Sequence, residues 1–249
     1  MYRFFIDEVL SESSIRNSTI NIEGEDYNHL KNALRIRIGE DIEITDSLEK
    51  TYLGTVETFE KKYCSLKIGK EILSDNEPLL EVTLYMSLLK GDRMDSAIQK
   101  SIECGVKRIV PLISRNTIVE ISDKNQKSKL ERWNKIARHA CMQCKRDHLV
   151  QVEPVISLKE AIELVKMEED FVSLVCHEKE ESFTLKAFME DNTKKKINIF
   201  IGPEGGFSDQ EIEIFSSSSI KSLSLGKRVL RADTACAAAV FFATAYSDL

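Results

Sequence analysis

The chain has 249 residues, of which 42% are hydrophobic and 31% are charged. This length allows one large domain or two modest ones, each with its own core. No apolar run is long enough to span a bilayer, and the N-terminus becomes acidic too soon for a signal peptide, so we expect a cytoplasmic protein with no membrane partner. The six cysteines are scattered, most of them among apolar residues, which indicates reduced thiols and not a disulfide framework.

The net charge of −6 argues against a generally basic nucleic-acid binder. The charge is uneven, however: residues 86–148 contain 14 Lys and Arg against 7 Asp and Glu, a local balance of +7, so the rest of the chain carries −13. This basic middle has two interpretations. It either forms a positive face that attracts phosphates or solvates helix surfaces, and the sequence favours neither.

The first part of the chain predicts a small β domain over residues 1–73. Short segments alternate between apolar and polar residues, which is typical of an antiparallel barrel or sandwich with one face in the core; they cover residues 41–44, 52–57 and 63–68. Between them, residues 27–37 predict one or two helical turns that run into a strand. A dense basic cluster falls on these turns: Lys31, Arg35 and Arg37.

A polar linker at residues 74–78 ends this domain, because Pro78 favours an extended chain before it. Strands then alternate with helices, which predicts an α/β domain with a mostly parallel sheet over residues 79–249. The expected strands cover residues 82–89, 108–113, 171–176, 197–201 and 222–225. The expected helices cover residues 93–104, 128–146 and 157–166, a segment that begins at Ser208, and residues 234–246.

The strand at residues 197–201 leads into a glycine-rich loop. Glycines can adopt positive φ and bring the backbone close to a ligand; here they are Gly202, Gly205 and Gly206. Ser208 and Glu211 form a capping box that starts the next helix, and Ser157 with Glu160 forms a second one at the start of the helix at residues 157–166. Because ligands of open α/β sheets bind at the carboxyl ends of strands, we expect a ligand site here.

The loop does not match the common phosphate-binding patterns. It lacks the lysine that follows the last glycine of a P-loop, and its spacing differs from the G-x-G-x-x-G of dinucleotide sites. Glu204 also puts a carboxylate where a polyphosphate would lie. A cofactor that is not strongly anionic, with an adenosine, an amino acid and a sulfonium, fits better.

A second strand, glycine, turn and helix follow at residues 223–246. Asp233 or Thr234 is expected to cap the final helix. That helix is almost wholly apolar, so we expect it in the core or at a subunit interface.

These two segments, Ile201 to Glu211 and Leu225 to Ala235, closely resemble the RsmE-type rRNA uridine methyltransferases of the SPOUT superfamily. The resemblance covers the whole chain, with matching residues at Lys90-Gly91-Asp92-Arg93-Met94, Gln99-Lys100, Gly105, Pro111-Leu112, and His29 to Arg35 with Gly39. Two positions depart from the family pattern: Met142 replaces a glutamate, and Cys104 replaces a leucine.

The resemblance implies a small PUA-like β-barrel, then a SPOUT domain whose C-terminal segment is threaded into a trefoil knot. It implies a homodimer through the knot domain and S-adenosylmethionine held mainly by backbone groups. The implied cofactor-binding residues are Ile201, Gly202, Pro203, Glu204, Gly205, Gly206, Leu225, Gly226, Val229, Leu230 and Arg231. The implied substrate is a uridine of 16S rRNA in the 30S subunit, methylated at N3.

The reaction suggests roles for three residues. Arg231 and Arg93 are candidates to stabilise negative charge on uracil, and the base is Asp233 or water. Asp233 has a second interpretation as a helix cap. Candidate RNA-binding residues, each of which has the alternative of a solvated surface side chain, are Arg3, Lys31, Arg35, Arg37, Lys90, Arg115 and Arg146.

The sequence is also compatible with other functions. No histidine or cysteine has the spacing of a metal site, so we expect no metal. The alternatives to the leading function are a SPOUT methyltransferase that acts on another RNA position and a non-catalytic RNA-binding dimer.

Overall fold

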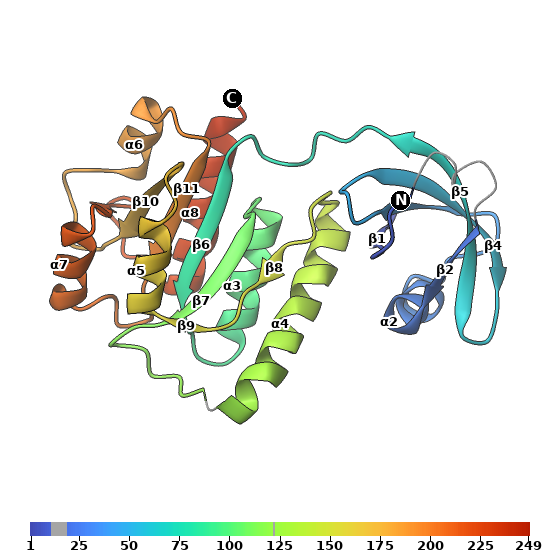
Figure 1. Ribbon diagram of the computed structural model, residues 1–249, viewed down its shortest axis with the longest axis horizontal. Coiled ribbons are helices and arrows are strands. Elements are labelled where there is room, and N and C mark those ends of the chain that lie inside the picture. The colour runs from blue at the N-terminus through green and yellow to red at the C-terminus, as the bar shows by residue number, and fades with distance from the viewer. Residues whose placement is uncertain (11–18, 122) are drawn as a thin grey trace. The chain divides into compact units, whose positions relative to one another are not determined.

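The computed structural model describes residues 1–10, 19–121 and 123–249. The chain forms two compact units. Unit 1 comprises Met1–Asn76 together with Cys141–Leu149, and unit 2 comprises Glu77–Ala140 together with Val150–Leu249. Figure 1 labels their helices and strands.

Unit 1 is built on a sheet with the strand order β1-β3-β4-β5-β2 among its described residues. The strands are β1 (Arg3–Phe5), β2 (Thr19–Glu23), β3 (Asp41–Thr45), β4 (Thr51–Phe59) and β5 (Tyr63–Ile72). β1 pairs with β3 in parallel, and the other pairs are antiparallel. The side chains of Ile42, Ile44 and Leu66 are fully buried, as the alternation predicts.

The helical turns predicted after residue 27 are present, but their shape differs from the expectation. α2 (Gly24–Asn28) continues into a π-helical turn, η1 (His29–Ala33), and both are anchored by buried side chains, Tyr27 and Leu30. The strand expected next does not form: Arg35 has φ of 55°, which turns the chain away from an extended course.

A buried ion cluster joins β1 to the segment Cys141–Leu149 within unit 1. Arg3 is 2% exposed; its Nε donates to Glu43 at 3.0 Å, and its Nη1 donates to Asp147 at 2.6 Å. Lys145 pairs with the second oxygen of Glu43 at 3.1 Å. Removal of Arg3 would take this cation from the buried Asp147, whereas Glu43 would keep its pair with Lys145.

Unit 2 contains a parallel sheet of strand order β12-β10-β11-β6-β7-β8, with β9 beside β7. The strands are β6 (Glu81–Ser87), β7 (Arg108–Ile113), β8 (Gln151–Val152), β9 (Ile156–Ser157), β10 (Phe171–Cys176), β11 (Lys196–Ile201) and β12 (Lys221–Leu223). Every pair within this sheet is parallel. The predicted α/β class with a parallel sheet is confirmed.

Helices cover both faces of this sheet (Figure 1). They are α3 (Asp92–Glu103), α4 (Asp123–Cys144), α5 (Leu158–Lys166), α6 (Leu185–Asp191), α7 (Asp209–Ser217) and α8 (Ala232–Ser247). One face packs against α5 and α7 around Phe200 and Phe215, whose rings meet edge to face at 5.0 Å. α8 packs against α3, β6 and β11.

The helix starts test the predicted caps directly. Both predicted capping boxes are present, Ser157 with Glu160 and Ser208 with Glu211. The cap predicted for the last helix is wrong. α8 starts two residues earlier than expected from a cap at Asp233, and its N-cap residue, Arg231, makes no side-chain capping bond.

All six cysteines are free thiols, as expected. None of the helices in the described ranges combines the length and the apolar composition that a bilayer crossing requires. The trefoil knot implied by the resemblance stays a prediction.

Candidate functional site

A cavity of about 530 Å³ opens in unit 2 at the carboxyl ends of three adjacent strands, β12, β10 and β11. Three loops line it: residues 176–178 after β10, residues 201–207 after β11, and residues 224–232 after β12. Arg93 at the start of α3 and Ala235 in α8 complete the lining. This is the sheet edge at which α/β proteins hold their ligands.

The first glycine loop can follow its path only because two positions lack a side chain. A Cβ on Gly202 would lie 3.0 Å from the backbone nitrogen of Phe207. Gly206 has φ of +66°, and a Cβ there would lie 3.1 Å and 3.2 Å from the carboxylate oxygens of Glu178. The loop therefore folds tightly on itself and brings backbone groups to the cavity wall.

Hydrogen bonds from the loop after β7 hold the glycine loop in place. The Asn116 side-chain amide donates to the carbonyls of Gly205 at 3.2 Å and Gly206 at 3.1 Å. The Glu211 carboxylate accepts from the backbone N–H of Arg115 at 2.7 Å and from that of Ser208 at 2.8 Å. The loop is thus fixed by side chains that do not line the cavity.

Glu204 ties the same loop to the start of α3. Its Oε1 accepts from the backbone N–H of Lys90 at 3.1 Å and from the Arg93 guanidinium at 3.3 Å. Partial burial acts to raise the pKa of Glu204, but backbone hydrogen bonds, including that from Lys90, and the charge of Arg93 outweigh it and lower the pKa. Glu204 is therefore a paired carboxylate at neutral pH.

The second glycine loop brings positive charge to the cavity. Ser224 anchors it by pairing with Thr184 as an isolated bridge, and Gly226 turns the chain with φ of +116°. Three exposed cations follow on the cavity wall: Lys227, Arg228 and Arg231. The cavity thus combines backbone groups, cations and carboxylates, a mixture that suits a ligand with both signs of charge.

The structure brings together all eleven residues expected to bind the cofactor. All eleven line the same cavity, which both glycine loops enclose. Arg93 and Arg231, two of the three expected catalytic residues, also line it. Asp233 does not: it is the second residue of α8, half buried and outside the lining.

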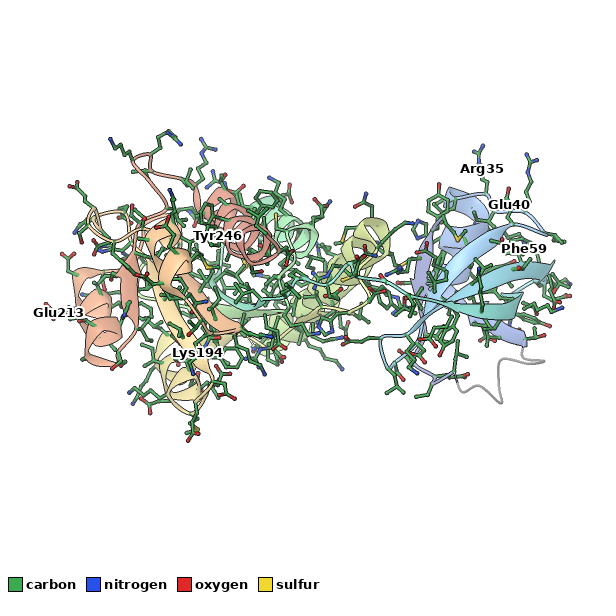
Figure 2. All side chains as sticks on the ribbon, turned by 90° about the horizontal axis from the view of Figure 1, so that it is seen from above. Arg35, Glu40, Phe59, Lys194, Glu213 and Tyr246 are labelled. Carbon is green, nitrogen blue, oxygen red and sulfur yellow. The ribbon has the colours of Figure 1, made fainter. Side chains whose placement is uncertain are left out.

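The RNA-binding candidates divide by exposure. Lys31, Arg35 and Arg37 are exposed in unit 1, and Figure 2 shows Arg35 pointing out from its unit. The Lys31 ammonium donates to the Tyr27 hydroxyl at 2.6 Å and lies 5.1 Å from the centre of the Tyr27 ring.

The interpretation of Arg3 and Arg146 as surface contacts needs correction, because their side chains are 2% and 3% exposed. In unit 2, Lys90 and Arg115 are exposed, and the Arg115 guanidinium bonds to Gln210.

Sequence reasoning missed the third loop of the cavity. Cys176 ends β10 and His177 and Glu178 follow it; all three line the cavity because β10 lies beside β11 in the sheet. Burial raises the pKa of the Cys176 thiol to about 12. The signal was available, since the strand ending at residue 176 was predicted and its carboxyl end is where a ligand binds. Within the described part of the chain, no group of three or more His, Cys, Asp and Glu side chains could hold a metal ion.

Comparison with known proteins identifies the family. The family model described as an RNA methyltransferase domain matches residues 75–243, and that of an RNA methyltransferase PUA domain matches residues 22–69. A Ribosomal RNA small subunit methyltransferase E from Mesomycoplasma hyopneumoniae is 33% identical, with 98% of each chain covered. The protein of the same name from Bacillus subtilis is 28% identical, with 94% of this chain and 93% of the relative covered.

Solved structures agree with this match. The Ribosomal RNA small subunit methyltransferase E from Neisseria gonorrhoeae, bound to S-adenosyl methionine, has a TM-score of 0.85 and 33% identity, covering 96% of this chain and 95% of its own. A putative methyltransferase from Legionella pneumophila in complex with the same cofactor has a TM-score of 0.86 and 27% identity, covering 98% of this chain and 96% of its own. The resemblance predicted from the two glycine segments is confirmed, and the chain belongs to the ribosomal RNA small subunit methyltransferase E family.

Proposed function

We propose that this protein transfers a methyl group from S-adenosylmethionine to N3 of a uridine in 16S rRNA, with the assembled 30S subunit as substrate. The observation that carries the proposal is the cavity at the ends of β10, β11 and β12, where two glycine loops meet. An rRNA substrate also makes the cytoplasm the place of action.

The cavity fits the cofactor in size and chemistry. Its volume of about 530 Å³ lies within the range of small-molecule sites. Gly202, Gly205 and Gly206 present backbone groups in the cavity lining, and the exposed cations at Lys227, Arg228 and Arg231 suit a carboxylate. The relatives from Neisseria gonorrhoeae and Legionella pneumophila bind the same cofactor. We therefore assign cofactor binding to the eleven predicted residues.

The reaction requires a proton to leave and a charge to be stabilised. When bound, the cofactor supplies an electrophilic methyl group on a sulfonium. Uracil N3 carries a proton and is a poor nucleophile until that proton is lost. The N3–H proton passes to water, the N3–CH₃ bond forms, and the S–CH₃ bond breaks with its electron pair left on sulfur. We prefer water to Asp233 as the base because Asp233 does not line the cavity.

Two arginines at the cavity wall are placed to assist. Arg231 and Arg93 carry positive charge where the uracil oxygens become negative, which lowers the barrier to proton loss. Arg93 is held by Glu204 at 3.3 Å, so its position is set before the substrate arrives. Alignment of the two reacting atoms can contribute roughly 7–11 kcal/mol in well-oriented systems.

Unit 1 supplies the exposed basic residues of the RNA contact. Lys31, Arg35 and Arg37 are solvent-exposed on the helical turns and the loop after them. Phosphate contacts of this kind position an RNA without reading its sequence. We assign Lys90 and Arg115, which are exposed in unit 2, to the same role.

The exposed face of α8 supports a homodimer. Phe241 is 61% exposed and Phe242 is 37% exposed, and Phe242 stacks on Tyr246 with ring centres 5.9 Å apart. Aromatic side chains on a helix that is otherwise apolar favour a protein interface. We therefore propose that two copies associate through unit 2.

The proposal is tested by mapping methylated nucleotides in small-subunit rRNA from a strain that lacks the gene. Loss of one N3-methyluridine, restored by the wild-type gene but not by an Arg231→Ala variant, is the expected result. Retention of every N3-methyluridine would overturn the proposal. Loss of a different methylation would favour a methyltransferase with another RNA target, and unchanged methylation with RNA binding intact would favour a non-catalytic dimer.

A further inference from the structure

Glu178 puts a carboxylate in the cavity wall that no described residue holds by a hydrogen bond or an ion pair. It is the second residue after β10, lines the cavity and is exposed. Both carboxylate oxygens lie against Gly206, 3.1 Å and 3.2 Å from where a Cβ would be. Among the residues that the structure describes, none donates a hydrogen bond to this carboxylate or forms an ion pair with it.

The other carboxylate of the cavity, Glu204, is paired within the protein. Glu204 accepts hydrogen bonds from Arg93 and from the backbone of Lys90, so its charge is offset within the protein. The neighbouring Lys179 forms its ion pair with Asp209 at 2.7 Å and acts on Glu178 only as a nearby charge. Glu178 thus contributes a negative charge to the cavity wall that no described residue pairs with directly.

Three cations of the cavity come from a different loop. Lys227, Arg228 and Arg231 follow β12, whereas Glu178 follows β10 and contacts the glycine loop after β11. A ligand that spans these loops meets positive groups from one and a negative group from another. S-adenosylmethionine has this division of charge, with a carboxylate at one position and an ammonium and a sulfonium nearby.

Building on the proposed function, we propose that Glu178 is the counter-charge for the cationic centre of S-adenosylmethionine and makes the cavity prefer the cofactor over its product. Methyl transfer converts the sulfonium into a neutral thioether, so S-adenosylhomocysteine has lost the positive charge that Glu178 attracts. The Glu178 carboxylate attracts the cationic cofactor but not the sulfur of the product, which favours release of the product and binding of a new cofactor. Attraction between opposite charges a few ångströms apart is weakened by water, yet at a partly enclosed wall it is large enough to change affinity by about tenfold.

The absence of a side chain at Gly206 fits this role. A side chain there would displace the Glu178 carboxylate, since a Cβ would already lie within 3.2 Å of both oxygens. The Gly206 carbonyl accepts a hydrogen bond from the Asn116 side-chain amide at 3.1 Å. Glycine at this position therefore keeps the carboxylate beside the loop that is expected to hold the cofactor.

The test is titration calorimetry of the full-length protein with three ligands: S-adenosylmethionine, S-adenosylhomocysteine and sinefungin, which has a charged amine in place of the sulfonium methyl. Glu178→Gln keeps the shape and removes the charge. Glu181→Gln is the matched control, because it removes the same charge three residues later from an exposed residue that does not line the cavity.

We expect Glu178→Gln to weaken S-adenosylmethionine and sinefungin by about tenfold while S-adenosylhomocysteine changes by less than about threefold. Glu181→Gln should leave all three affinities unchanged. An equal loss for all three ligands, or no loss for any, would overturn the proposal, because either result means that Glu178 does not sense the positive charge. A wild-type protein that binds none of the three ligands would instead contradict the proposed function.

Discussion

The Asn116 side-chain amide donates a hydrogen bond to the Gly206 carbonyl at 3.1 Å, joining the loop after β7 to the glycine loop after β11. The same amide reaches the Gly205 carbonyl at 3.2 Å. One side chain therefore holds two successive peptide groups of the glycine loop. A loop held in this way loses less conformational entropy when a ligand binds.

Asn116→Ala should weaken S-adenosylmethionine binding by about tenfold, because two hydrogen bonds of about 1 kcal/mol each no longer hold the loop. The free energy of unfolding should fall by about 1–2 kcal/mol. Calorimetry and urea denaturation measure the two effects. Asn192→Ala is the control, since Asn192 donates to the Lys194 carbonyl in an exposed turn outside the cavity. An unchanged affinity in Asn116→Ala would show that the loop keeps its shape without this contact.

Gly202 and Gly205 should respond differently to a methyl group. A Cβ on Gly202 would lie 3.0 Å from the Phe207 nitrogen, so the backbone has to move, and we expect Gly202→Ala to lower the free energy of unfolding by about 1–3 kcal/mol. A Cβ on Gly205 would lie 3.4 Å from the Asn116 Cβ, an ordinary contact, and Gly205→Ala should change stability by less than about 0.5 kcal/mol. Urea denaturation measures the free energy of unfolding of both variants. Equal values would contradict the close backbone contact at Gly202.

The Cys176 thiol should be almost inert although it lines the cavity. Burial raises its pKa from 9.0 to about 12, so the reactive thiolate at pH 8 is about a thousandfold scarcer than in an exposed cysteine. Because the shift is upward, reactivity should rise only as the pH approaches the raised pKa. Iodoacetamide labelling followed by peptide mass spectrometry measures the rate in the folded and in the urea-unfolded protein. Rapid labelling of Cys176 in the folded protein at pH 8 would be inconsistent with its burial.

The double substitution Arg35→Ala with Arg37→Ala should weaken binding to small-subunit rRNA and leave S-adenosylmethionine affinity unchanged. If each arginine contacts one phosphate, the slope of log affinity against log salt should become less steep by about two. The matched control is Lys67→Ala with Lys70→Ala, which removes two charges from exposed residues of β5 in the same unit. Equal losses in both double variants would point to overall charge and not to a defined RNA contact.

Local chemistry made much of unit 2 predictable from the sequence. The capping boxes at Ser157 and Ser208 are where the pattern of Ser followed three residues later by Glu requires them. The strand before Gly202 and the glycine loop after it were also predicted, because a β-branched run and a cluster of glycines each have one dominant interpretation. Edge strands of two or three residues, such as β8 and β12, are too short to show their full extent in a pattern.

What the sequence could not provide is the set of contacts between distant segments. Glu178 lies 28 positions before Gly206, and only the placement of β10 beside β11 brings them together. From its sequence context Arg3 has two interpretations, a solvated surface side chain and an rRNA phosphate contact, and both require an exposed side chain. Its burial against Glu43 and Asp147 depends on a segment more than 140 residues away in the chain. The final helix shows the same limit: Asp233 is a good capping residue, yet α8 begins before it.

The most direct test of the account is methyl transfer to purified 30S subunits that lack the modification, with S-adenosylmethionine that carries a deuterated methyl group. After digestion of the rRNA, mass spectrometry identifies the labelled nucleoside. We expect labelled 3-methyluridine from the wild-type protein and strongly reduced label from the Arg231→Ala variant. Label in a ribose or in another base, or no label although the protein binds the cofactor, would contradict it.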